Sequence, residues 1–325
     1  MNMNTMKSVS RVLIIAALML VTGYAQAEAA KLGKGVAFRF NPPDGTTFVE
    51  TYKHTTKKSL FGIASKPIII TTKTRITIKK TDKGYHATKI PIYYNMEGIP
   101  SIFGNPARDA IIKFLDCTVV EYELDKEGKC IGVVGIEKMA DEIEAEVRKI
   151  APRGMRLNPQ IIMSMIESAA SIEAARWDAR FSAMAGHYMN VGESVKASTP
   201  RELPYSGELI KENCVTKLSE LVKVGGKEFA RVQRSSTLDN ETLCDWYNKS
   251  KTVIFSSDGG YNYESAEVSS AQDIEKIEYT IDPSTQLPHS ISSKSTTKIV
   301  GSVSDTSNIQ FLSDEWEQYT YDYSK

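Results

Sequence analysis

The sequence predicts an α+β fold that is rich in β-strands: two related, curved antiparallel sheets, like half-barrels, with a helical segment between them. Strand patterns separated by short turns fill both halves of the chain, helical patterns fill its middle, and segments of the first half are echoed in the second. The predicted divisions are a signal peptide (1–27), an N-terminal β lobe (28–134), a helical connector (135–189) and a C-terminal β lobe (190–325).

The first residues have the layout of a secretory signal peptide. Lys7 and Arg11 precede an apolar run, and Ala25 and Ala27 supply a small-x-small cleavage site. The apolar run is too short to span a bilayer comfortably. We expect cleavage after Ala27, or as a second choice after Ala29, and a soluble mature protein that is periplasmic or secreted.

The first half of the mature chain is predicted to form antiparallel strands. Residues 68–80 alternate between a face that carries Thr74 and Ile76 and a face that carries Lys73, Arg75 and Lys79. This period of two is typical of a half-exposed strand. Other strands are expected over residues 46–54, 85–94, 118–124 and 130–134, with a short helix over residues 105–116.

The middle of the chain is predicted to be helical. An amphipathic pattern covers residues 136–150, and Asn158 and Pro159 then provide a capping side chain and a proline at the first position of a helix that reaches Met189. Residues 161–170 are apolar over about half of the helix circumference, wider than the stripe of a one-sided surface helix.

Methionine gives this helical middle a possible role in binding. Six of the seven methionines of the mature chain lie there, and methionine forms adaptable apolar surfaces. Either the long helix is simply packed between the two lobes, or part of it lines an apolar cleft. In the second case the candidate ligand-binding residues are Ile162, Met165, Ile166 and Met184.

Strand patterns resume after residue 189. They are expected over residues 191–197, 214–224, 227–238, 252–255, 261–268, 274–281, 289–300 and 309–323. Residues 277–282 (IEYTID) echo residues 120–125 (VEYELD), and each segment is followed by a turn and a return strand. An internal duplication explains the echo, with chance similarity between strand-rich segments as the alternative.

Four cysteines lie in the mature chain: Cys117, Cys130, Cys214 and Cys244. An even number in an oxidising compartment favours two disulfides, for which three connectivities are possible. We favour one bridge in each half, Cys117–Cys130 and Cys214–Cys244, because short loops close most easily. No CxxC motif or nearby histidine pair is present, so we expect no metal site and no cofactor.

Charge is distributed unevenly along the chain. Residues 53–89 include ten basic residues and one acidic residue, and residues 239–282 include ten acidic and three basic residues. Lys73, Arg75 and Lys79 would form a basic stripe able to dock on an anionic membrane surface or an acidic partner. A solvated face, or an edge strand protected by lysines, is the alternative. Nucleic acid is not an expected partner, because the protein is exported and its basic segment lacks interleaved aromatic residues.

Motifs of catalysis are missing from the sequence. It contains no GxSxG elbow, HExxH motif, P-loop or dinucleotide fingerprint, and its four histidines are scattered. We therefore expect a protein that is not an enzyme. A hydrolase whose site is assembled only in space is the alternative.

Residues 120–125 and 277–282 have the pattern of hairpins in a curved antiparallel sheet, and a glycine-led strand (192–195, GESV) follows a helical stretch. In these patterns the chain resembles bacterial lipoprotein-carrier proteins of the Lol type, and two-lobed exported proteins of unknown function. The resemblance implies a half-open barrel that holds acyl chains against helices packed as a plug. The chain differs from the carriers in having two lobes.

Together these observations predict an exported binding protein. Its partner would be an apolar or amphipathic ligand, such as a lipid, carried in the bacterial envelope. The alternative is an envelope assembly or scaffold protein that acts through contacts with an envelope protein.

Overall fold

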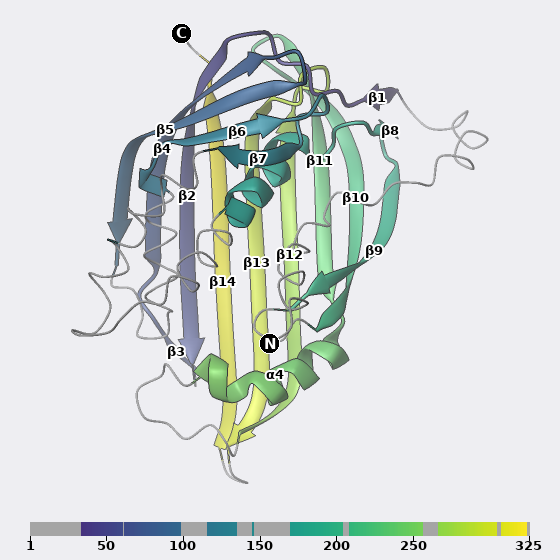
Figure 1. Cartoon of the computed structure of the whole chain (residues 1–325). Helices are drawn as coiled ribbons and strands as arrows, with labels where there is room; N and C mark the ends of the chain where they lie inside the picture. Colours follow the sequence, from purple (N-terminus) through teal and green to yellow (C-terminus); the bar gives the residue numbers. More distant parts are fainter. Residues whose placement is uncertain are drawn as a thin grey trace, which may run out of the picture.

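The computed structural model describes residues 34–60, 62–98, 116–134, 145, 170–203, 208–255, 266–303 and 307–323. Within these ranges the protein consists mainly of long antiparallel strands with short helices, so the predicted β-rich α+β class is confirmed (Figure 1). The signal peptide and most of the helices predicted over residues 105–116 and 136–150 lie outside the described residues. The same holds for residues 158–169 of the long helix. The prediction that this helix reaches Met189 is wrong, because the helical segment ends at Ser182 and residues 188–190 form a strand.

The strands of the described ranges form one sheet of twelve and one of two. The order in the large sheet is β7 (Cys130–Val134), β6 (Val120–Leu124), β5 (Tyr85–Glu97), β4 (Ile68–Lys80), β2 (Thr46–Leu60), β14 (Ser307–Asp322), β13 (Pro288–Val303), β12 (Ala266–Ile281), β11 (Lys227–Leu238), β10 (Leu209–Val224) and β9 (Ser194–Glu202), with β3 (Ile63–Ala64) beside β2. The small sheet pairs β1 (Gly35–Ala37) with β8 (Tyr188–Asn190).

The strands of the first half of the chain, β2 to β7, and those of the second half, β9 to β14, form the two sides of one continuous large sheet. They are joined where β2 pairs with β14, in a register that runs from Val49 opposite Asp322 to Leu60 opposite Phe311. Figure 1 shows these strands, purple and yellow, side by side at the centre of the sheet. The first and the last long strands of the chain are therefore neighbours, and the remaining long strands extend from them as two meanders.

The large sheet curves around a short helical segment, residues 170–182, seen as a teal coil in Figure 1. Residues 170–177 form an α-helix that continues as the π-helical turn η3 (Asp178–Ser182). Trp177 and Phe181 of this segment are fully buried against sheet side chains, among them Phe48, Tyr122 and Tyr321. We call the face of the sheet that meets this segment the inner face, and the opposite face the outer face.

The other end of the inner face is covered by helix α4 (Asn240–Phe255). Asp239 caps this helix, because its carboxylate accepts hydrogen bonds from the N–H and the hydroxyl of Thr242 at 3.0 and 2.8 Å. The helix contributes to a second apolar cluster, formed by Leu203, Ile210, Leu238, Leu243, Trp246, Val268, Ala271 and Ile299.

Two predictions for this part of the chain are wrong. Residues 252–255, expected to be a strand, belong to helix α4. Separate strands were expected over residues 261–268 and 274–281, but residues 266–268, the described part of the first, are continuous with the second in β12. No helix among the described residues is long and apolar enough to cross a membrane.

The two echoed segments occupy similar hairpins. The strand β6 is followed by Asp125, whose carboxylate accepts hydrogen bonds from the N–H groups of Glu127 and Lys129 at 3.0 and 2.9 Å. The strand β12 is followed by Asp282, whose carboxylate accepts a hydrogen bond from the N–H of Ser284 at 2.9 Å. In both hairpins an aspartate side chain therefore stabilises the turn, while the duplication itself stays a prediction.

The predicted disulfide Cys117–Cys130 is not formed. Cys130 lies opposite Leu124, at the turn end of the β6–β7 hairpin, whereas Cys117 precedes the other end of β6. The five residues of β6, roughly 15 Å of strand, separate the two positions. A disulfide requires Cα atoms within about 7 Å.

The predicted disulfide Cys214–Cys244 is not formed either. Cys214 lies opposite Ser236 across the β10–β11 pair. The Sγ atom of Cys244 on α4 instead lies 3.0 Å from the carbonyl oxygen of Val268 on β12, one strand further along the sheet. The helix that was not predicted thus carries Cys244 away from its expected partner.

Candidate functional site

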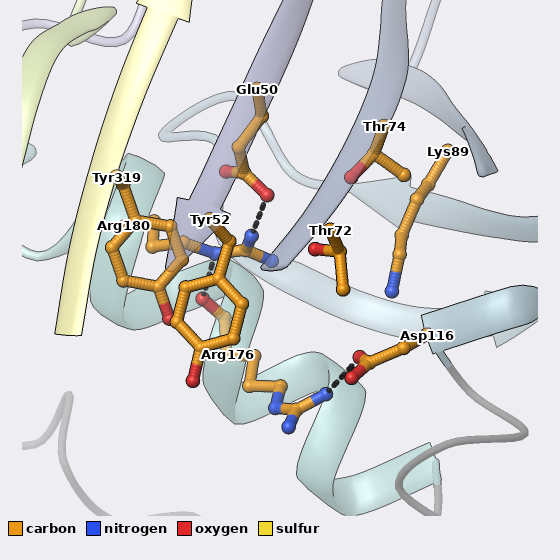
Figure 2. A pocket seen from close by; sticks show the side chains of 9 residues that line it. All are labelled: Glu50, Tyr52, Thr72, Thr74, Lys89, Asp116, Arg176, Arg180 and Tyr319. Atoms are coloured by element: carbon orange, nitrogen blue, oxygen red, sulfur yellow. Dashed lines mark hydrogen bonds and ion pairs between the residues drawn. The ribbon is translucent and has the colours of Figure 1, made fainter. Parts of the chain in front are cut away.

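A cluster of buried charges lies where the helical segment 170–182 meets the inner face of the sheet (Figure 2). Three acids and three bases form it, and we call them the ionic cluster: Glu50, Lys89, Asp116, Glu173, Arg176 and Arg180. The helical segment supplies three members, and β2 and β5 supply one each. Asp116 precedes β6.

The spacing of the three helical members explains their common orientation. Glu173, Arg176 and Arg180 follow one another at intervals of three and four residues, which places them on one side of a helix. Trp177 and Phe181 lie beside them on the buried side. The segment therefore faces the sheet with apolar and charged side chains together.

Glu173 lies at the centre of the ionic cluster and is fully buried. One of its oxygens, Oε2, lies 3.1 Å from Nζ of Lys89 and accepts a hydrogen bond of 2.7 Å from the hydroxyl of Tyr122. The other oxygen accepts one of 3.0 Å from Nη1 of Arg176. Burial alone would raise the pKa of Glu173, but the charges of Lys89, Arg176 and Arg180 and the hydrogen bond from Tyr122 outweigh it and lower the pKa to about 2.

Arg180 and Glu50 form a second buried pair, with 2.5 Å between Nη1 and Oε1. The guanidinium also lies 5.5 Å from the ring centre of Tyr319, a cation–π distance. Oε2 of Glu50 is buried and has no hydrogen-bond partner among the residues that the structure describes. Glu50 consequently depends on Arg180 for the compensation of its charge.

Arg176 connects the helical segment to the chain before β6. Its Nη1 atom lies 3.1 Å from Oδ1 of Asp116, in addition to its contact with Glu173. Several members of the cluster line a hollow of about 20 Å³, enough for about one water molecule. Figure 2 shows its lining residues, which are Glu50, Tyr52, Thr72, Thr74, Lys89, Asp116, Arg176, Arg180 and Tyr319.

The ionic cluster is suited to holding the helical segment on the sheet rather than to transferring protons. Its charges balance, the carboxylates of Glu50, Asp116 and Glu173 each contact a guanidinium, and the low pKa keeps Glu173 ionised at neutral pH. Such groups are poorly suited to accept or release a proton near neutral pH. The cluster fixes the helical segment in position on the sheet.

The middle of the inner face is polar. We call the following half-buried or buried side chains, which lie between the apolar cluster at the helical segment and the one at α4, the polar belt: His54, Arg234, Ser236, Asp273, Glu275, Ser293, Ser295, Thr297, Glu315 and Glu317. Successive side chains of a strand point to opposite faces of the sheet, so the residues between these positions point to the outer face.

Several members of the polar belt are tied to one another or to their surroundings. Oγ1 of Thr297 donates a hydrogen bond of 2.8 Å to Asp273, and the hydroxyl of Tyr52 donates one of 2.9 Å to Glu317. Burial raises the pKa of Glu275 above its ordinary value. The belt thus offers carboxylates, hydroxyls and a guanidinium on a surface whose two ends are apolar.

The predicted ligand-binding residues are only partly described. Ile162, Met165 and Ile166 lie outside the described residues, so their role stays a prediction. Met184 is buried in the apolar core with Trp177 and packs as a core residue.

The predicted basic stripe lies on one exposed surface. Lys73, Arg75 and Lys79 alternate with buried residues on β4 and point to the outer face. The strand β4 lies between β2 and β5 rather than at an edge of the sheet, so protection of an edge does not explain these lysines. Their docking to an anionic surface stays a prediction.

The ionic cluster was not predicted from the sequence, although it left a signal. Glu173, Arg176 and Arg180 interrupt the apolar arc of a helix. Glu50 occupies an inward-pointing position of a strand, two residues after Phe48. Charged residues at inward positions indicate paired charges in the core. The sequence pattern could not say which residues pair.

Comparison with known proteins gives only distant structural likenesses. No family model matches the sequence, and no curated protein matches it. A solved structure described as showing lipid–protein interactions in lipovitellin is 10% identical, with a TM-score of 0.40 over 87% of this chain and 26% of that chain. An outer membrane channel from Pseudomonas putida F1 is 8% identical, with a TM-score of 0.13 over 87% of this chain and 97% of that chain.

The chain spans about a quarter of the lipovitellin chain. At these TM-scores neither likeness supports an inference about what the protein binds. Since no family model matches, the resemblance to Lol-type carriers also stays a prediction.

Proposed function

We propose that the protein is a non-enzymatic binding protein of the bacterial envelope, which carries an amphipathic ligand such as a lipid against the inner face of its curved sheet. The observation that supports this most is the polar belt between two apolar clusters on that face. A ligand with both a polar and an apolar part matches such a surface. A purely apolar ligand would remove water from ionisable side chains without replacing their hydrogen bonds, which is unfavourable.

The ionic cluster has a supporting role in this proposal. It holds the helical segment 170–182 against one end of the inner face, so that the apolar side chains there form a fixed wall. At the opposite end α4 forms the second wall, since Asn248 of this helix hydrogen-bonds the backbone N–H and carbonyl of Val268 on β12 at 2.7 and 2.9 Å. Rigid walls lower the entropic cost of ordering a bound ligand.

The proposal includes the predicted export and the predicted apolar contacts of the long helix. A carrier in the envelope would receive a lipid at one membrane and release it at another site, which requires binding without chemistry. Ile162, Met165 and Ile166 would contact the apolar part of the ligand, and the polar belt its headgroup.

Native mass spectrometry of the protein purified from the cells that make it tests this proposal. We expect a mass above that of the polypeptide, and a lipid recovered on extraction with organic solvent. Two variants on adjacent positions of β13 locate the ligand: Ser295→Trp fills the inner face, whereas Thr296→Trp points to the outer face. We expect Ser295→Trp to lose the ligand and Thr296→Trp to keep it.

The proposal is contradicted by a clean polypeptide mass for the wild-type protein with no lipid in the extract. Equal loss in both variants would also contradict it, because binding would then not depend on the inner face.

A further inference from the structure

The outer face of the sheet carries a groove that the proposed carrier function does not use. It has a volume of about 630 Å³ and runs across β9 to β14. The side chains that point into it from the outer face are those of Ser194, Val215, Lys217, Gln233, Ser235, Lys276, Glu278, Ser292, Lys294 and Trp316. Small-molecule sites have volumes of ~300–1,000 Å³, so the groove is large enough for an organic ligand.

Three lysines of the groove are not neutralised within the described part of the chain. No ion pair joins Lys217, Lys276 or Lys294 to a carboxylate there. The groove's own acid, Glu278, instead accepts a hydrogen bond of 3.2 Å from Gln233 and lies 3.7 Å from Arg231. The groove therefore keeps an excess of positive charge.

The arrangement of two of these lysines is costly without an anion. Lys276 on β12 lies directly opposite Lys294 on β13 in the sheet register. Like charges opposite one another on neighbouring strands destabilise the pair. Both strands lie inside the sheet, so the use of lysine to protect an exposed edge does not apply.

An exposed aromatic ring lies next to this lysine pair. Trp316 of β14 lies opposite Lys294 and is 36% exposed, and Nζ of Lys294 is 5.5 Å from its ring centre. The other two tryptophans, Trp177 and Trp246, are buried. A flat apolar ring beside unneutralised cations suits a ligand that has both a ring face and negative charge.

We propose that this groove binds an acidic saccharide. A sugar ring would stack on the indole of Trp316, its carboxylate would lie between Lys276 and Lys294, and its hydroxyl groups would bond to the groove's serines and to Gln233. A flat bilayer cannot enter a hollow surface, and an acidic peptide without rings would not use the indole. The groove lies on the face opposite to the polar belt, so this proposal is independent of the carrier function.

Titration of the full-length protein with a tetramer of galacturonic acid, followed by tryptophan fluorescence and calorimetry, tests the proposal. We expect saturable binding that weakens with salt, with an emission change from Trp316 because the other two rings are buried. The double variant K276S/K294S should weaken binding about tenfold, the sum expected from two exposed charge contacts. A neutral galactose tetramer should bind far more weakly.

The matched control is Lys298→Ser. Lys298 lies on the same strand, is exposed on the same face and does not line the groove, so its loss should leave binding unchanged. Absence of saturable binding to the wild-type protein at millimolar saccharide would overturn the proposal. So would equal weakening by Lys298→Ser, or equally tight binding of a polyglutamate of the same charge or of anionic phospholipid vesicles.

Discussion

Replacing Arg180 with methionine is expected to lower the free energy of unfolding by about 3–5 kcal/mol. The substitution removes the cation that lies 2.5 Å from Glu50, whose other oxygen has no partner among the described residues. A buried carboxylate is then left without compensation, and this cost, rather than the lost attraction, dominates the effect. Urea unfolding followed by circular dichroism measures the change.

Two further variants test whether the loss of stability arises from the burial of the charges. Arg231→Met removes the cation of an ion pair with Glu220 whose side chains are 37% and 51% exposed, and should cost less than about 1 kcal/mol. The double variant Glu50→Leu/Arg180→Met removes both buried charges and should recover part of the lost stability. If Arg180→Met costs no more than Arg231→Met, the ionic cluster does not anchor the helical segment.

Acidification is expected to destabilise the protein by about 3 kcal/mol through Glu173 alone. Its pKa is about 2 in the folded protein, against an ordinary value of 4.5. Because the folded pKa is the lower one, the unfolded chain binds a proton first. The stabilisation is fully present above pH 4.5 and is lost as the pH falls from 4.5 to about 2.

The comparison of wild-type protein with Glu173→Gln isolates this contribution. The variant should be less stable at neutral pH, because a neutral amide removes the negative charge that contacts Lys89 and Arg176. Between pH 4.5 and 2 its stability should fall less than that of the wild type, by about the same 3 kcal/mol. Glu123→Gln, at an exposed position of β6, should show the wild-type dependence. Identical acid unfolding curves for wild type and Glu173→Gln would contradict the assigned pKa.

Local patterns predicted individual strands well. The strands expected over residues 68–80 and 227–238 coincide with β4 and β11. In β4 the alternation indicated the strand because one face is buried and the other exposed. The strand prediction for residues 252–255 is wrong because four residues with β propensity do not outweigh a helix that starts at a capping aspartate. The conformation of a short segment is therefore decided by the element in which it lies, and not by its own propensity alone.

Pairing between distant segments could not be predicted. Alternation indicates that β2 and β14 are strands, but it contains no information on which strand lies beside which. The same limit explains the wrong disulfides, which were chosen by loop length rather than by position in the sheet. It also explains why the ionic cluster was missed, since Glu50 and Arg180 are brought together only by the packing of the helical segment on β2.

A photo-reactive residue on the inner face offers the most direct test of the proposed carrier function. Benzoylphenylalanine introduced in place of Ser295 on the inner face, or of Thr296 on the outer face, can be activated in the cells that make the protein. We predict a covalent adduct with a small amphipathic molecule at position 295 and none at position 296. A cross-link from position 295 to the protein's own chain alone would contradict the proposal, because the inner face would then be filled by the protein itself.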